Sequence, residues 1–198
     1  MTRLLVGYWS AAVLLFAGGC GHGRFQVQPW RVGQWVRYDV TSHDRKWELE
    51  YAVVGKERNG NSQLFWLEAR RFDEADSLFL KWLVPRGLEG PAAKVLIGER
   101  GAPAGLVVEG ACLTEKLGKE NGCNAPRYLA METVETPAGR FSSKKFKHPA
   151  GLVWLSPKVP VFGIVRLNRG EEELVLVAYG LRGATSELIE ASGTAAIP

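Results

Sequence analysis

The stretch Trp47-Glu-Leu-Glu-Tyr-Ala-Val-Val-Gly55 alternates large apolar residues with acidic ones. In an extended chain its odd-numbered residues fall on one side, and Glu48 and Glu50 fall on the other. Side chains that alternate with period two are typical of a strand with one buried face. The preceding stretch, residues 34–40, shows the same alternation. Together the two stretches predict neighbouring strands of an antiparallel sheet.

The pattern continues on the C-terminal side of this strand. Asn59-Gly60 is a strong hairpin signal and leads into a second apolar stretch, residues 62–70. Residues 77–84 are apolar on both faces, which predicts either a central strand or one whose second face meets something apolar. No long stripe with a 3.6-residue period occurs, so few short helices are expected.

Residues 85–128 are rich in Gly, Pro and Ala, and one or two helical turns are expected within 111–121. A loop-rich region this long is usually functional or poorly ordered. Strands are expected again in 128–136, 152–168 and 172–180. Between the first two, a turn at 136–139 leads into the basic stretch 140–147. That stretch has no purely apolar face, which favours an edge strand or a strand wetted on both faces.

The first twenty residues read as an export signal. Arg3 is followed by a short apolar run, the small residues Ala17-Gly18-Gly19, and then Cys20. The apolar run is too short for a comfortable membrane span. The small residues before Cys20 resemble the lipobox of bacterial lipoproteins, in which the cysteine is acylated after cleavage. The alternative is an ordinary signal peptide with an incidental cysteine.

This reading divides the chain into a signal peptide at 1–19, an acylated cysteine and tether at 20–32, and a single β domain at 33–190. It places the protein in the bacterial cell envelope. Gly21 follows the cysteine, and in lipoproteins of the enterobacterial type the absence of Asp at that position implies sorting to the outer membrane, facing the periplasm.

The composition limits the classes of function. The chain has 198 residues, a formal charge of +4 and acidic runs that interrupt its basic ones, so we expect no nucleic-acid partner. We find no nucleophile elbow, phosphate loop or paired carboxylates, and therefore expect no enzyme and no cofactor. The three histidines lack ligand spacing, so no metal site is expected. Cys112 and Cys123 form an even pair that could close a disulfide in an oxidising compartment.

The C-terminal third resembles a family of envelope proteins. The turn 136–141, the basic strand, and the segments 154–157, 159–166 and 174–180 occur in an order similar to that in LolA, LolB and LppX. That resemblance implies a strongly curved antiparallel sheet, an unclosed half-barrel whose concave side binds acyl chains in the carriers. In those families helices or loops plug the concave side.

Two functions follow as hypotheses. The first is a lipoprotein that binds a lipid or another hydrophobic ligand on the concave face of the sheet. The second is a structural or interaction lipoprotein that binds an envelope partner and no small molecule. For the first function, the candidate residues that would line the ligand site are large apolar side chains: Trp47, Leu49, Tyr51, Leu64, Trp66, Leu80, Trp82 and Trp154. The alternative is that these side chains simply pack in the core.

Overall fold

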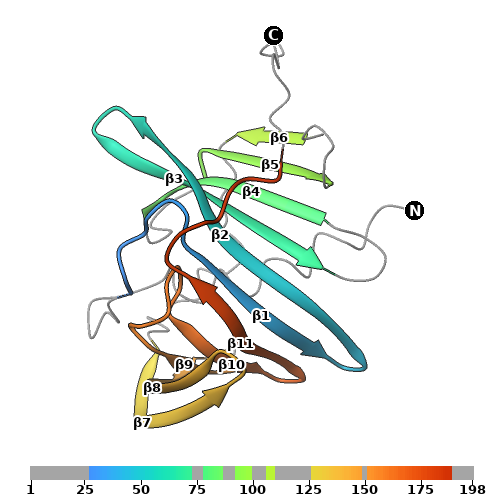
Figure 1. Cartoon of the computed structure of the whole chain (residues 1–198), viewed down its shortest axis with the longest axis vertical. Helices are drawn as coiled ribbons and strands as arrows, with labels where there is room; N and C mark the ends of the chain where they lie inside the picture. Colours follow the sequence, from blue (N-terminus) through green and yellow to red (C-terminus); the bar gives the residue numbers. More distant parts are fainter. Residues whose placement is uncertain are drawn as a thin grey trace, which may run out of the picture.

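The computed structural model describes residues 27–72, 78–86, 92–99, 106–109, 126–148 and 151–188 (Figure 1). The predicted signal peptide, the predicted lipidation site Cys20, the pair Cys112 and Cys123, and the helical turns expected in 111–121 lie outside these residues. The described segments contain no helix long and apolar enough to cross a membrane.

The described residues form eleven strands. They are β1 (Trp35–Ser42), β2 (Arg45–Asn59), β3 (Ser62–Phe72), β4 (Leu78–Pro85), β5 (Lys94–Glu99), β6 (Leu106–Glu109), β7 (Arg127–Thr136), β8 (Gly139–His148), β9 (Gly151–Leu155), β10 (Ile164–Arg169) and β11 (Glu172–Gly180).

All eleven strands belong to one antiparallel sheet with the order β6-β5-β4-β3-β2-β1-β11-β10-β9-β8-β7. Every neighbouring pair is also consecutive in sequence except β1 and β11, which join the two halves of the chain. The sheet does not close, and β6 and β7 are its edges. The expectation of a mainly β, open antiparallel sheet is therefore confirmed.

One face of the sheet, which we call the inner face, carries the main core. Strands close to both edges contribute to it, for example Val95 on β5, Val36 on β1 and Phe141 on β8. The sheet must therefore curve so that distant strands meet around one cluster, and Figure 1 shows the β7–β11 half curling below the β1–β6 half. On strands such as β1, apolar residues that alternate at period two supply this face, for example Val36, Tyr38 and Val40.

Two irregular segments, residues 27–34 and 156–163, fill part of the inner face. Trp30 packs edge-to-face against Phe65 and Phe162, with ring centroids 5.8 and 6.3 Å apart. Its indole N–H donates to the carbonyl oxygen of Val161 at 2.6 Å. The tether was expected to extend to residue 32, but Trp30 is buried in the core, so residues 27–32 belong to the folded domain.

Two tyrosines lie at the centre of this core. Tyr38 and Tyr51 are almost fully buried, and the hydroxyl of Tyr38 donates to the carbonyl oxygen of Ile164 at 3.2 Å. Burial raises the pKa of both phenols above the usual value; the proximity of Tyr51 adds to the effect at Tyr38, and that of Glu172 at Tyr51. Both phenols are therefore neutral at neutral pH.

The opposite face of the sheet, the outer face, is also buried over β2, β3 and β4. A second apolar cluster comprises Leu64, Trp66, Leu83 and Leu96. Strand β4 contributes to both faces, with Trp82 and Val84 inside and Leu83 outside. The prediction that residues 77–84 form a central strand is confirmed, because β4 pairs with β3 and with β5.

The basic stretch forms β8, and it is not an edge strand. It pairs with β7 on one side and with β9 on the other, so β7 is the edge. The sequence suggested an edge because its apolar residues follow no single face. In the structure Phe141 and Phe146 both join the main core although they are five positions apart, so no single period-two face marks this strand in the sequence.

Candidate functional site

The eight predicted lining residues lie on two faces of the sheet. Leu49, Tyr51, Trp82 and Trp154 belong to the main core, and Trp47 and Leu80 pack against it. Leu64 and Trp66 lie in the outer-face cluster instead. The parity of β3 explains the split, because its odd-numbered residues Phe65 and Leu67 point inward. A ligand on the inner face could therefore touch at most six of the eight.

Three of the predicted tryptophans carry a cation over their rings. Arg71 lies over Trp47 at 4.6 Å from the centroid, and Lys81 lies over Trp66 at 4.8 Å. Cations at such distances are attracted by the electron-rich ring face. These indoles therefore have polar neighbours, which a purely apolar acyl chain would not match.

Trp154 on β9 has the most elaborate of these environments. Lys145 and Arg166 lie over its ring at 4.9 and 5.8 Å. Its indole N–H donates to Glu132 at 2.6 Å, and the ammonium group of Lys145 donates to the other oxygen of that carboxylate at 3.0 Å. These hydrogen bonds, from Trp154 first and Lys145 second, hold the pKa of Glu132 below its usual value.

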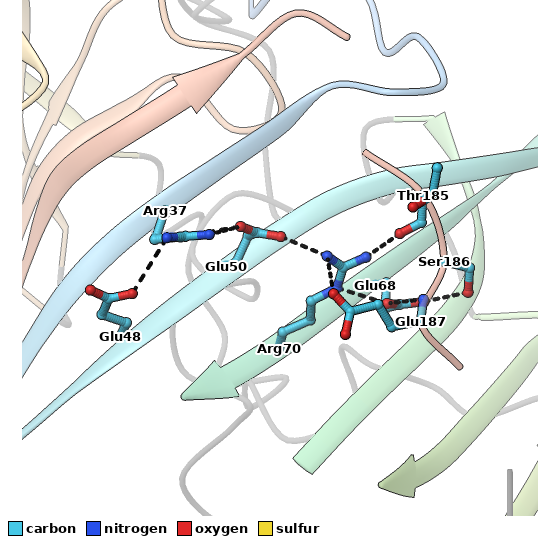
Figure 2. Close-up of polar contacts among 8 residues, drawn as sticks. All are labelled: Arg37, Glu48, Glu50, Glu68, Arg70, Thr185, Ser186 and Glu187. Carbon is cyan, nitrogen blue, oxygen red and sulfur yellow. Dashed lines mark hydrogen bonds and ion pairs between the residues drawn. The ribbon is translucent and has the colours of Figure 1, made fainter. Parts of the chain in front are cut away.

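A second polar cluster lies on the outer face of β1, β2 and β3 (Figure 2). Glu50 accepts from Arg37 at 2.9 Å through one oxygen and from Arg70 at 2.9 Å through the other. Arg70 also donates through Nε to Glu68 at 2.8 Å. Arg37 additionally pairs with Glu48 at 3.7 Å, which extends the row of alternating charges toward solvent.

This cluster is buried to an unusual degree. The side chain of Glu68 is fully buried, that of Glu50 is 6% exposed and that of Arg70 is 7% exposed. Buried charges require partners because removing them from water is costly. We therefore name Glu50, Glu68 and Arg70 the outer-face ion cluster.

A C-terminal segment, residues 184–188, covers the outer-face ion cluster, and we call it the C-terminal strap. Arg70 donates to the carbonyl oxygen of Thr185 and to Glu187 at 3.3 Å. Ser186 donates its hydroxyl to Glu68 at 2.6 Å, and the backbone N–H of Glu187 donates to the same carboxylate at 3.2 Å. In Figure 1 the strap continues from β11 across β2.

Sequence reasoning placed Glu50 on the solvent side of its strand and assigned no role to Glu68 or Arg70. The alternation of β2 and β3 is correct, but it does not show that a distant segment covers the outer face. One signal was available, because the four consecutive residues 64–67 are all apolar, at even as well as odd positions. That pattern is typical of a strand that is buried on both faces.

The edge strand β7 exposes large apolar side chains. Tyr128 is 51% exposed, Leu129 38% and Met131 53%. Among the described residues, no strand pairs with the side of β7 that faces away from β8. Edge strands are normally protected by charges or by irregular backbone. On β7, Arg127 and Glu135 lie near the two ends, and Glu132 in the middle is engaged by Trp154 and Lys145.

Within the described ranges, no three His, Cys, Asp or Glu side chains are placed to hold a metal ion. A scan against protein-family models and a search of curated proteins both find no match. Among solved structures, the chain is similar to a protein from Parabacteroides distasonis described as a lipoprotein. The identity is 12% and the TM-score 0.39, over 77% of this chain and 97% of that one.

A second similar structure is a protein from Bacteroides fragilis described as exported and as having a YmcC-like fold. It is 11% identical with a TM-score of 0.37, again over 77% of this chain and 97% of that one. At these identities and TM-scores the likeness assigns no function to this chain.

Proposed function

We propose that this protein is a lipoprotein of the bacterial cell envelope, anchored through an acylated Cys20. The signal-like residues 1–19 and the small residues before Cys20 support the anchor. Replacement of Cys20→Ser is expected to move the protein from the membrane fraction to the soluble fraction. Full retention of the variant in the membrane fraction would overturn the anchor. An outer-membrane location facing the periplasm is part of the same proposal.

We further propose that the domain acts as an interaction module that pairs with an extended segment of an envelope partner. The observation that supports this is the β7 edge, where Tyr128, Leu129 and Met131 are exposed beside unpaired backbone. An edge strand offers its main chain to a partner strand, and neighbouring side chains supply selectivity. The proposal includes no catalytic activity, no cofactor and no nucleic-acid partner.

The test uses a photoreactive residue in the intact lipoprotein. p-Benzoylphenylalanine replaces Met131 in bacterial cells, and the matched control carries it at Asp44, an exposed position in the β1–β2 turn. We expect a protein adduct of one discrete mass at position 131 that is lost when Tyr128→Lys is added. No adduct at 131, or equal adducts at both positions, would overturn the interaction proposal.

A hydrophobic ligand on the inner face is the second candidate. Trp47, Leu49 and Tyr51 on β2, with Leu80 and Trp82 on β4, share that face, and Trp47 and Leu80 are only partly buried. Native mass spectrometry of the protein purified without detergent tests this directly. A co-purifying mass of acyl-lipid size that is lost on denaturation would favour the ligand. A bare protein mass would favour the interaction module.

A further inference from the structure

The described chain begins at one end of the sheet, where its first residues are fixed in place. The side-chain amide of Gln28 donates to the carbonyl oxygens of Pro157 at 2.9 Å and Lys158 at 3.3 Å. Trp30 is held against Val161 in the same loop. The chain therefore enters the domain beside the loop 156–163.

The length of chain before this point limits how far the domain can lie from its anchor. Cys20 and Val27 are seven positions apart. An extended chain spans at most about 3.6 Å per residue, so this tether reaches about 25 Å. If Cys20 is acylated, as proposed above, the end of the domain next to Val27 stays close to the membrane surface.

Two segments meet at this end and expose apolar side chains. The backbone N–H of Ala184 donates to the carbonyl oxygen of Gly33 at 3.0 Å. Gly33 has a φ of 96°, and a Cβ there would lie 3.1 Å from the backbone nitrogen of Gly183, so glycine permits this close approach. On either side of the contact, Val32 is 44% exposed and Leu181 is 55% exposed.

The three segments that meet here carry charge of one sign. Arg31, Lys158 and Arg182 are exposed, and the three segments that meet here, residues 27–34, 156–163 and 181–184, contain no Asp or Glu. Basic side chains are attracted to anionic lipid headgroups, and apolar side chains beside them insert into the headgroup boundary. We define the tether-side patch as Arg31, Val32, Lys158, Leu181 and Arg182.

We infer that the tether-side patch rests on the anionic surface of the membrane that holds the lipid anchor, which fixes the orientation of the domain. This inference depends on the proposed lipoprotein function. The short tether, the positive charge of the three segments and the two exposed apolar residues each fit a lipid surface. Strand β1 is eight residues, or about 25 Å, long. The β1–β2 turn at its other end therefore lies about that far from the patch, on the side away from the membrane.

The experiment places p-benzoylphenylalanine at Leu181 in the full chain, expressed in cells in which the anchor is retained. After illumination, phospholipid adducts are measured by mass spectrometry. The control carries the same residue at Asp44, at the far end of β1. We expect lipid adducts at 181 in several-fold excess over those at 44. Equal yields at the two positions, or a protein adduct at 181 in place of lipid, would overturn the inference.

A pair of charge variants tests the electrostatic part. Arg31→Glu with Arg182→Glu is expected to lower the lipid adduct at 181 several-fold. Arg45→Glu with Lys46→Glu makes the same change of charge on exposed residues at the far end of β1 and is expected to leave the adduct unchanged. An equal response to both pairs would overturn the role of the tether-side patch.

Fractionation of the same cells separates this inference from the anchor. If the chain is in the membrane fraction but gives no lipid adduct at 181, the orientation is wrong and the anchor stands. If the chain is soluble even with Cys20 intact, both the anchor and the orientation are overturned.

Discussion

The two halves of the sheet differ in how far their polar side chains are covered. Over β2, β3 and β4 the outer face is covered, and it buries Glu68 and Arg70 under the C-terminal strap. Strands β7 and β8 in the other half instead carry exposed side chains such as Met131 and Lys144. Both halves share one inner core. The difference shows that alternation identifies a strand and its two faces but does not tell whether the polar face is wet.

The largest expected effect comes from removing the central cation of the outer-face ion cluster. Arg70→Met removes the guanidinium group and leaves two buried carboxylates without their cation. The variant should lower the free energy of unfolding by about 3–5 kcal/mol. The matched change in the other half is Arg166→Met, which breaks a pair with Glu173 whose side chains are 40% and 34% exposed. That change should cost about 0–1 kcal/mol. Denaturant unfolding of both variants measures how much free energy of unfolding each one loses. Equal losses would contradict the expected difference between the two halves.

An intermediate effect is expected at the C-terminal strap. Ser186→Ala removes the hydroxyl that donates to the buried carboxylate of Glu68. Leaving a buried acceptor without its donor costs about 1–3 kcal/mol, and thermal unfolding would report the loss. Ser142→Ala on β8, an exposed serine, is the control and should stay within about 0.5 kcal/mol of the parent. If the hydrogen bond from the strap contributes no stability, the two variants will unfold at the same temperature.

The smallest effect concerns pH in the β7–β11 half. The pKa of Glu132 is lowered in the folded protein by its bonds to Trp154 and Lys145. A lowered pKa contributes stability that is present above the unfolded pKa and is lost as the pH falls through the folded pKa. The parent should therefore lose more stability than Glu132→Gln when the pH is lowered from neutral into that acidic range. Parallel unfolding curves at each pH give the comparison, and identical pH profiles would exclude this contribution.

Much of the fold could be predicted because its signals are local. The alternation in residues 47–53, the Asn59-Gly60 turn and the apolar run in 77–84 each depend on neighbours a few positions away, and the structure has β2, a hairpin and β4 there. The candidate lining residues were less predictable. Trp66 has the same chemistry as Trp82, but the parity of β3 places Trp66 on the outer face.

The features that sequence reasoning missed all depend on contacts between distant residues. Ser186 meets Glu68 across 118 positions, and Trp30 meets Val161 across 131. No pattern within a strand reports such a contact. For the same reason β8 could be taken for an edge, since pairing with β9 depends on the path of the sheet and not on the basic residues themselves.

Periodicity and turn signals in the sequence predicted most of the strands, although not β5 and β6, which lie in the Gly-, Pro- and Ala-rich region. The family resemblance implied an open, curved sheet, and the export signal in the first twenty residues stays a prediction. Periodicity, turn chemistry and composition act over short stretches of chain. The burial of particular polar residues, the identity of the edge strand and the end of the sheet at which Val27 enters could be seen only in the folded structure. Those properties arise when segments far apart in the chain pack together, because burial depends on what covers a face and not on the residues that form it.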